Sequence, residues 1–231
     1  MSPKKIYHGG TEARRKDFLK NLRVSVSSWF DFDLKFDREV VAITILSTLL
    51  LMVDYYERIT PLKVIDRVAL YLLIPLGVIL LAFRKSPREY GFTFGDWRSG
   101  FALTVIIIAI AAPILWFIAR SDPAMVRYYA DQANAAAPLL TFLDLIGWEF
   151  FFRGFLLFGY ARVFGANALW LQAVPFALAH ISKPAVETYS TIFGGFLFGL
   201  VAWKSKSFVY PFLIHWFIAT FTMFAAAGAA R

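Results

Sequence analysis

The sequence contains no cysteine. Disulfide bonds, thiolate metal sites and a cysteine nucleophile are therefore excluded for this chain. Charged side chains are also scarce, at 17% of the 231 residues, whereas 59% are hydrophobic and 18% aromatic. Soluble domains contain roughly 25% charged residues on average. The composition is thus too apolar for an ordinary soluble domain and favours a membrane protein.

Apolar runs of about 17–25 residues account for this composition, and this is the length that crosses a hydrocarbon core about 30 Å thick. No cleavable signal peptide is apparent, because the first run begins only after a long basic tail. We expect the first run to act as its own insertion signal. Seven spans are expected, at residues 40–56, 67–83, 100–119, 138–160, 166–182, 185–203 and 208–228.

The sequence therefore predicts an all-α fold, a polytopic transmembrane helical bundle with about seven spans. Residues 40–231 form the transmembrane domain in this interpretation, and residues 1–39 form a cytoplasmic basic tail with an interfacial segment. Alternating apolar and charged residues at 25–37 fit either a short strand or an interfacial segment. The loop at 120–137, which contains Asp122-Pro123 and a run of alanines, is expected to form a short helix over the bundle.

The net charge of +8 is distributed as membrane topology requires, which argues against a nucleic-acid partner. With the N-terminus inside, sixteen Lys and Arg fall in the tail and the inner loops, against seven on the opposite side. Positive residues gather on the cytoplasmic side of membrane proteins. This asymmetry predicts an N-in, C-out topology.

The middle of the largely apolar stretch 140–160 contains a glutamate and an arginine. Glu149 and Arg153 are four residues apart, so on a helix they share one face at about 6 Å along the axis. Ionisable groups are costly at membrane depth and usually face a bundle interior or a water-filled cavity with a partner. The pair is therefore the first candidate for a functional site.

Two histidines accompany this pair in other apolar runs. His180 shares a helix face with Phe176, and His215 lies eight residues into the last expected span. One glutamate, one arginine and two histidines thus come from three different spans. Such a cluster can activate a water, because the carboxylate accepts its proton while histidines orient it or stabilise an oxyanion.

Other interpretations of these residues stay open. The Glu–Arg pair can be a structural ion pair, and a membrane histidine can simply hydrogen-bond neighbouring helices. Two histidines and a carboxylate also form a competent zinc set, but no His-Glu-x-x-His helix is present. A proton-relay transporter is a further alternative, although no inverted repeat is visible. We expect neither a metal nor another cofactor.

Glu149-x-x-x-Arg153, Phe176-x-x-x-His180 and His215 follow one another along the chain on three of the expected spans. In this order they resemble the three motifs of the CPBP family, the CAAX-protease and bacteriocin-processing (Abi) membrane proteins. Type II CAAX prenyl endopeptidases are its best-known members. The resemblance covers about residues 85–225.

The resemblance implies an intramembrane glutamic-type peptidase that hydrolyses a peptide bond near a membrane-anchored C-terminus. Glu149 would be the general base, His180 its partner and His215 an oxyanion donor, while Arg153 would orient the glutamate. The implied partners are the lipid bilayer and a membrane-anchored or C-terminally processed protein substrate. The implied location is the cell (inner) membrane of a prokaryote, as a multi-pass protein.

Two positions depart from the family pattern. The family opens with paired glutamates, and the first of the pair is here Trp148. Its last motif is usually His-x-x-x-Asn, and the fourth position is here Ala219. Either the site is rewired, or the protein is a catalytically silent bacteriocin-immunity or scaffold protein of the same fold.

Glu187 is the candidate for such rewiring. Pro184 marks the start of the sixth expected span, which places Glu187 in its first turn. A carboxylate is stabilised at a helix N-terminus, which is the structural interpretation of this residue. The connection to His180 is short, so Glu187 could instead return a second acid to the site. The depth of the cluster further predicts a cavity open to the outer half of the membrane.

Overall fold

The computed structural model describes residues 14–20 and 35–230. It divides into two units, Met1–Phe36 and Asp37–Arg231, and the second contains every residue of the expected site. Residues 14–20 form a short exposed helix. Much of the expected basic tail and most of the segment at 25–37 fall on residues 1–13 and 21–34, outside the described residues.

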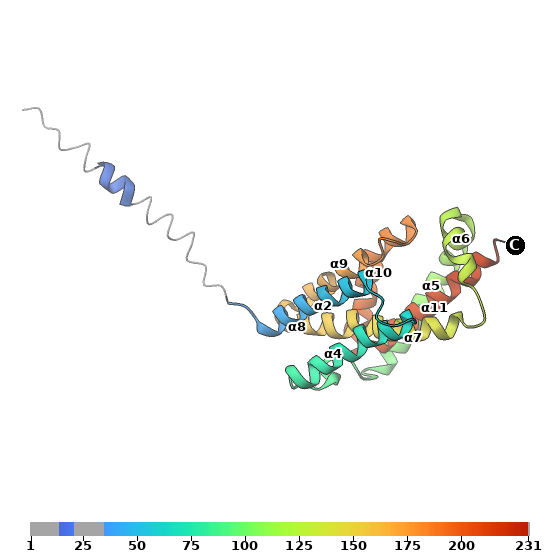
Figure 1. The fold of residues 1–231 in the computed structure, drawn as a ribbon, viewed down its shortest axis with the longest axis horizontal. Helices are drawn as coiled ribbons and strands as arrows, with labels where there is room; N and C mark the ends of the chain where they lie inside the picture. Colours follow the sequence, from blue (N-terminus) through green and yellow to red (C-terminus); the bar gives the residue numbers. More distant parts are fainter. Residues whose placement is uncertain (1–13, 21–34, 231) are drawn as a thin grey trace, which may run out of the picture. The chain divides into compact units, whose positions relative to one another are not determined.

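Every regular element in the described part of the chain is helical, as the sequence predicts (Figure 1). The α-helices are α2 (Arg38–Tyr56), α3 (Lys63–Val68), α4 (Ile74–Gly77), α5 (Trp97–Ser121), α6 (Pro123–Tyr129), α7 (Ala137–Glu149), α8 (Leu157–Phe164), α9 (Ala168–Leu178), α10 (Ala185–Ser205) and α11 (Val209–Ala227). Wider π-helical turns form η1 (Ala69–Leu73), η2 (Val78–Ala82) and η5 (Phe150–Leu156). Tighter 3₁₀ turns form η3 (Pro87–Tyr90), η4 (Ala130–Gln132) and η6 (Gly165–Asn167).

Five helices in the described residues are long and apolar enough to cross a membrane: Arg38–Tyr56, Lys63–Ala82, Trp97–Ser121, Ala185–Ser205 and Val209–Ala227. A sixth is counted if the bent pair Pro123–Gln132 and Ala137–Leu178 is one span. The expected span at 138–160 and most of the one at 166–182 fall on the segment Ala137–Leu178. The helical membrane bundle is therefore confirmed, and the count of seven spans stays a prediction.

Aspartates begin several helices where the sequence changes from polar to apolar. Asp37 caps α2 by accepting from the amide of Val40 at 2.9 Å, and Asp122 caps α6 by accepting from that of Ala124 at 2.7 Å. Such caps satisfy amide groups that have no partner within the helix. The expected helix in the 120–137 loop is confirmed as α6, followed by η4.

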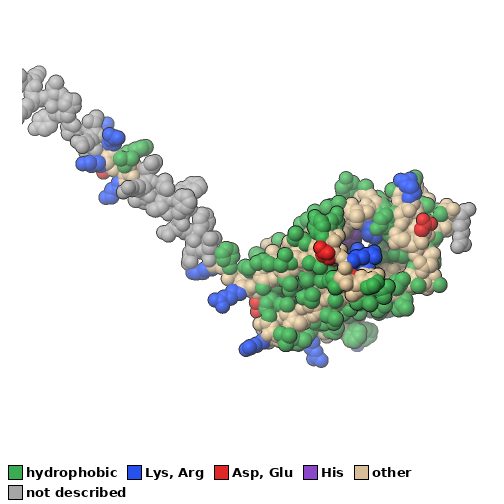
Figure 2. All heavy atoms as spheres, in the orientation of Figure 1, with side chains coloured by type: hydrophobic (Ala, Val, Ile, Leu, Met, Phe, Trp, Pro, Cys, Tyr) green, Lys and Arg blue, Asp and Glu red, His purple; other side chains and the backbone are tan. Residues whose placement is uncertain are grey.

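The interior of the unit Asp37–Arg231 is rich in aromatic side chains and also encloses polar and charged groups. All seven residues of η5 are buried, and Phe150, Phe151 and Phe152 are fully enclosed. Large hydrophobic side chains meanwhile cover much of the surface, as Figure 2 shows. Apolar side chains outside and ionisable groups inside are the arrangement expected of a protein dissolved in lipid.

Candidate active site

Glu149 and Arg153 lie where α7 passes into the π-helical turn η5. Both side chains are fully buried, and the Nη1 of Arg153 donates to Oε1 of Glu149 at 3.1 Å. The expected shared face is therefore confirmed. π-helical turns are rare, and those that occur inside a longer helix are often found at functional sites.

His215 of α11 binds the same carboxylate oxygen. Its Nδ1 donates to Oε1 of Glu149 at 2.6 Å. When the carboxylate of Glu149 is ionised it can only accept hydrogen bonds, and Nδ1 of His215 is then the donor. The other oxygen of Glu149, Oε2, is buried and has no hydrogen-bond partner among the described residues. One oxygen is thus fixed by two donors, whereas the second remains available.

His180 lies in the turn that follows α9, two residues after the helix ends at Leu178. Its Nδ1 donates to the carbonyl oxygen of Phe176 at 2.7 Å, which leaves the lone pair of the neutral ring on Nε2. The ring centroids of His180 and His215 are 6.4 Å apart. The structure therefore brings both histidines into one site, although no hydrogen bond in the described residues joins His180 to Glu149.

The guanidinium of Arg153 is enclosed by aromatic rings. Its Cζ lies 3.8 Å from the ring centroid of Phe176 and 5.2 Å from that of Phe198. Cation–π contacts of this kind are stronger when the groups are removed from water. They compensate in part for burying a cation whose Nε and Nη2 have no hydrogen-bond partner in the described residues. Phe198 was not expected from the sequence, because nothing in its local pattern distinguishes it from other span residues.

Trp148, which the resemblance aligns with the first of the family's paired glutamates, lies against the site. Its ring centroid is 5.9 Å from that of His180 and 5.3 Å from that of Tyr71. The Cζ of Arg67 lies 5.0 Å from the indole centroid. An apolar ring therefore stands where relatives are expected to have an acid.

Arg67 belongs to a second charged cluster that was not predicted from the sequence. Its Nη1 lies 2.5 Å from Oδ2 of Asp144, and its Nε lies 3.4 Å from Oδ2 of Asp54. These contacts join α2, α3 and α7 beside Trp148. The signal that could have revealed them is Asp144, an acid in the same apolar stretch as Glu149 and one turn before Trp148.

Glu187 lies in the first turn of α10, which begins after Pro184 as expected. Its Oε2 accepts from the hydroxyl of Tyr129 at 2.5 Å, and its Oε1 lies 3.9 Å from the Nζ of Lys183. No hydrogen bond or ion pair within residues 35–230 joins it to Glu149 or His215. Its role as a second acid stays a prediction.

Residues 132–221 match the family model described as "Type II CAAX prenyl endopeptidase Rce1-like". The expected resemblance is confirmed for this segment. No curated protein and no solved structure showed a significant match to the chain. The Rce1-like segment contains Glu149, Arg153, His180 and His215, and together with the apolar helices it indicates a multi-pass membrane protein.

The two histidines of the Rce1-like segment are slightly exposed, whereas Glu149 and Arg153 are fully buried. Figure 2 shows a hollow near α6 in which histidine and Lys or Arg side chains are visible, and His180 and His215 are the only described histidines. No group of three or more His, Asp and Glu side chains in the described residues could hold a metal ion. The arrangement that is present is a fixed carboxylate beside two imidazoles, which suits proton transfer.

Proposed function

We propose that this protein is an intramembrane endopeptidase. It hydrolyses a peptide bond near the membrane-anchored C-terminus of a protein substrate, and prenylated C-termini are the first class to test because the family is described by that activity. The observation that carries the proposal is the hydrogen bonding of the Glu149 carboxylate. One carboxylate oxygen is bound by Arg153 and His215, and the other is buried without a partner among the described residues.

Glu149 is the general base in this proposal. Its free Oε2 takes a proton from a water, whose oxygen then bonds to the carbonyl carbon of the substrate. His180 orients the same water through the lone pair on Nε2. His215, in its doubly protonated form, donates from Nε2 to the oxyanion. The proton held by Glu149 passes to the departing amine as the carbon–nitrogen bond breaks.

Arg153 orients Glu149 rather than contacting the substrate. It is fully buried, and its Nη1 holds one oxygen of the carboxylate in place. A cation beside the carboxylate also disfavours a divalent metal ion at the same oxygen, which supports a metal-free reaction.

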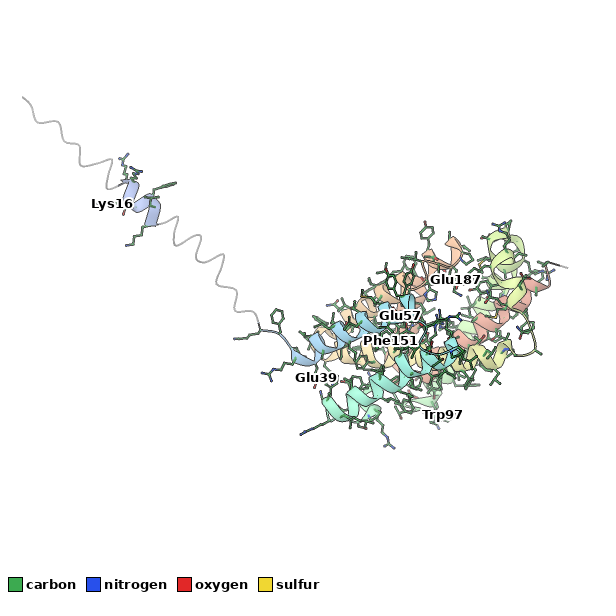
Figure 3. The ribbon with its side chains drawn as sticks, in the orientation of Figure 1. Lys16, Glu39, Glu57, Trp97, Phe151 and Glu187 are labelled. Carbon is green, nitrogen blue, oxygen red and sulfur yellow. The ribbon has the colours of Figure 1, made fainter. Side chains whose placement is uncertain are left out.

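We further propose seven spans, an N-in topology and a cavity open to the outer half of a prokaryotic cell membrane. The distribution of Lys and Arg supports this orientation. Glu39 and Glu187 lie toward opposite ends of the bundle with Phe151 between them, as Figure 3 shows. In the proposed orientation the end with Glu187, close to the His180 turn, is the outer one.

A catalytically silent immunity or scaffold protein is the second candidate. Trp148 supports it, because an indole packed 5.9 Å from His180 fills the position of an acid in relatives. Ala219 also supplies no amide one turn after His215.

Cleavage by purified protein in lipid vesicles tests the proposal. The substrates are a reporter with a prenylated C-terminal peptide and a reporter with a C-terminal transmembrane anchor. We expect the wild type to cut at least one of them and His180→Ala to cut neither while remaining folded. Equal reporter levels with and without wild-type protein would instead support the silent candidate.

A further inference from the structure

The backbone of His180 lies in the connection between two helices, whereas its ring is bound to the carbonyl oxygen of Phe176 in α9. The regular part of α9 ends at Leu178, and residues 179–182 form a turn. The carbonyl oxygen of His180 accepts from the hydroxyl of Thr188 at 2.7 Å and from the amide of Lys183 at 2.9 Å. Contacts that fix Lys183 and the first turn of α10 therefore also fix the His180 turn.

A tyrosine from a distant part of the sequence binds both Lys183 and the first turn of α10. The hydroxyl of Tyr129, at the end of α6, donates to Oε2 of Glu187 at 2.5 Å and accepts from the Nζ of Lys183 at 3.0 Å. The Nζ of Lys183 also lies 4.9 Å from the ring centroid of Tyr129. We call Tyr129, Lys183 and Glu187 the tyrosine latch.

The latch is fixed at its other end to the helix that carries His215. Tyr129 and Met125 of α6 are buried in one apolar cluster with Ala225 and Ala226 of α11. Helix α6 thus contacts α11 and, through Tyr129, also Lys183 and Glu187. This arrangement connects the two histidines through protein structure outside the site itself.

We infer that Tyr129 is a positioning residue that holds His180 at the active site through Lys183 and Glu187. The expected effect of Tyr129 on cleavage rests on the proposed function, whereas its expected effect on the position of His180 does not. In this account Glu187 supports the His180 turn and is not a second catalytic acid. Its contacts in the latch explain why a carboxylate stands at this position.

The matched pair Tyr129→Phe and Tyr128→Phe tests the inference. Tyr128 also lies over Lys183, with its ring centroid 4.8 Å from Nζ, but the latch uses the hydroxyl of Tyr129 alone. A misplacement of about 1 Å can cost about 100-fold in rate. We therefore expect Tyr129→Phe to lower kcat by about 10- to 100-fold with little change in KM, and Tyr128→Phe to retain the wild-type kcat.

Chemical labelling of the histidines gives a readout that does not depend on cleavage. The folded protein in lipid vesicles is treated with diethyl pyrocarbonate, and modification of His180 and His215 is followed by mass spectrometry. We expect Tyr129→Phe to raise the rate at His180 relative to His215, and Tyr128→Phe to leave that ratio unchanged. If the wild type cleaves no substrate, the proposed function fails, and the labelling ratio alone decides the inference.

Two variants of Glu187 distinguish a role in holding the His180 turn from a role as a catalytic acid. Glutamine can still accept from the hydroxyl of Tyr129, so Glu187→Gln should retain most activity and the wild-type labelling ratio. Glu187→Ala should behave like Tyr129→Phe. The inference is overturned if Tyr129→Phe and Tyr128→Phe give the same labelling ratio, or if Glu187→Gln abolishes cleavage as completely as Glu187→Ala.

Discussion

The Nδ1 of His215 lies 2.6 Å from Oε1 of Glu149, across a separation of 66 residues in the sequence. This contact joins α11 to the end of α7 in the interior of the bundle. It gives the Glu–Arg pair a third member, so that pair is not an isolated structural ion pair. Because the histidine and Arg153 share one oxygen, Oε2 of the carboxylate is left for another partner.

Arg153→Met should destabilise the protein strongly. The substitution leaves Glu149 as a buried charge without its cation, and breaking a buried pair in this way costs about 3–5 kcal/mol. The double variant Glu149→Gln/Arg153→Met should recover part of this loss, because it removes both charges. Denaturant unfolding in detergent micelles measures the free energy of unfolding of both variants. An Arg153→Met variant as stable as the wild type would show that the ion pair does not stabilise the fold.

Ala219→Asn should raise the rate of cleavage. Position 219 is one helical turn after His215 on α11, so an amide there lies on the same face as the histidine. Removing one oxyanion donor from a hydrolase costs about 100- to 1000-fold, so adding a less well-placed donor is expected to give about 10-fold in kcat. Steady-state kinetics on the reporter checks this. A lower kcat at unchanged stability would contradict an oxyanion site beside His215.

Local sequence pattern was enough to predict the helical class and part of the site. Apolar runs of spanning length predicted the helices, and Asp122-Pro123 predicted α6. The spacing of Glu149 and Arg153 predicted their shared face, since four residues are slightly more than one helical turn. These features depend on neighbours in the sequence and can be read from one chain.

Features that depend on packing between distant segments were not predicted. The ring of Phe198 over the guanidinium of Arg153 and the bond from Tyr129 to Glu187 join separate helices. Neither has a periodic or motif signal, because aromatic residues are common throughout the apolar runs. The position of Arg67 beside Trp148 depends on helix packing in the same way.

The orientation in the membrane can be tested directly because the chain has no cysteine. Single cysteines at Ser182 and Ser86, both exposed, report on opposite sides of the proposed topology. We expect a membrane-impermeant maleimide to label Ser182→Cys on intact cells, and Ser86→Cys only after permeabilisation. Labelling of Ser182→Cys from the cytoplasm alone would contradict a cavity open to the outer half.

The central claim is that the Glu149 carboxylate activates water without a metal ion. Its most direct test compares cleavage by the wild type and by Glu149→Gln, each with and without a chelator. Glutamine keeps an oxygen for His215 and Arg153 but cannot take a proton, so kcat should fall by at least about 100-fold. The chelator should change neither rate. Retained cleavage by Glu149→Gln would contradict the role of the carboxylate, and inhibition of the wild type by chelator would contradict the metal-free reaction.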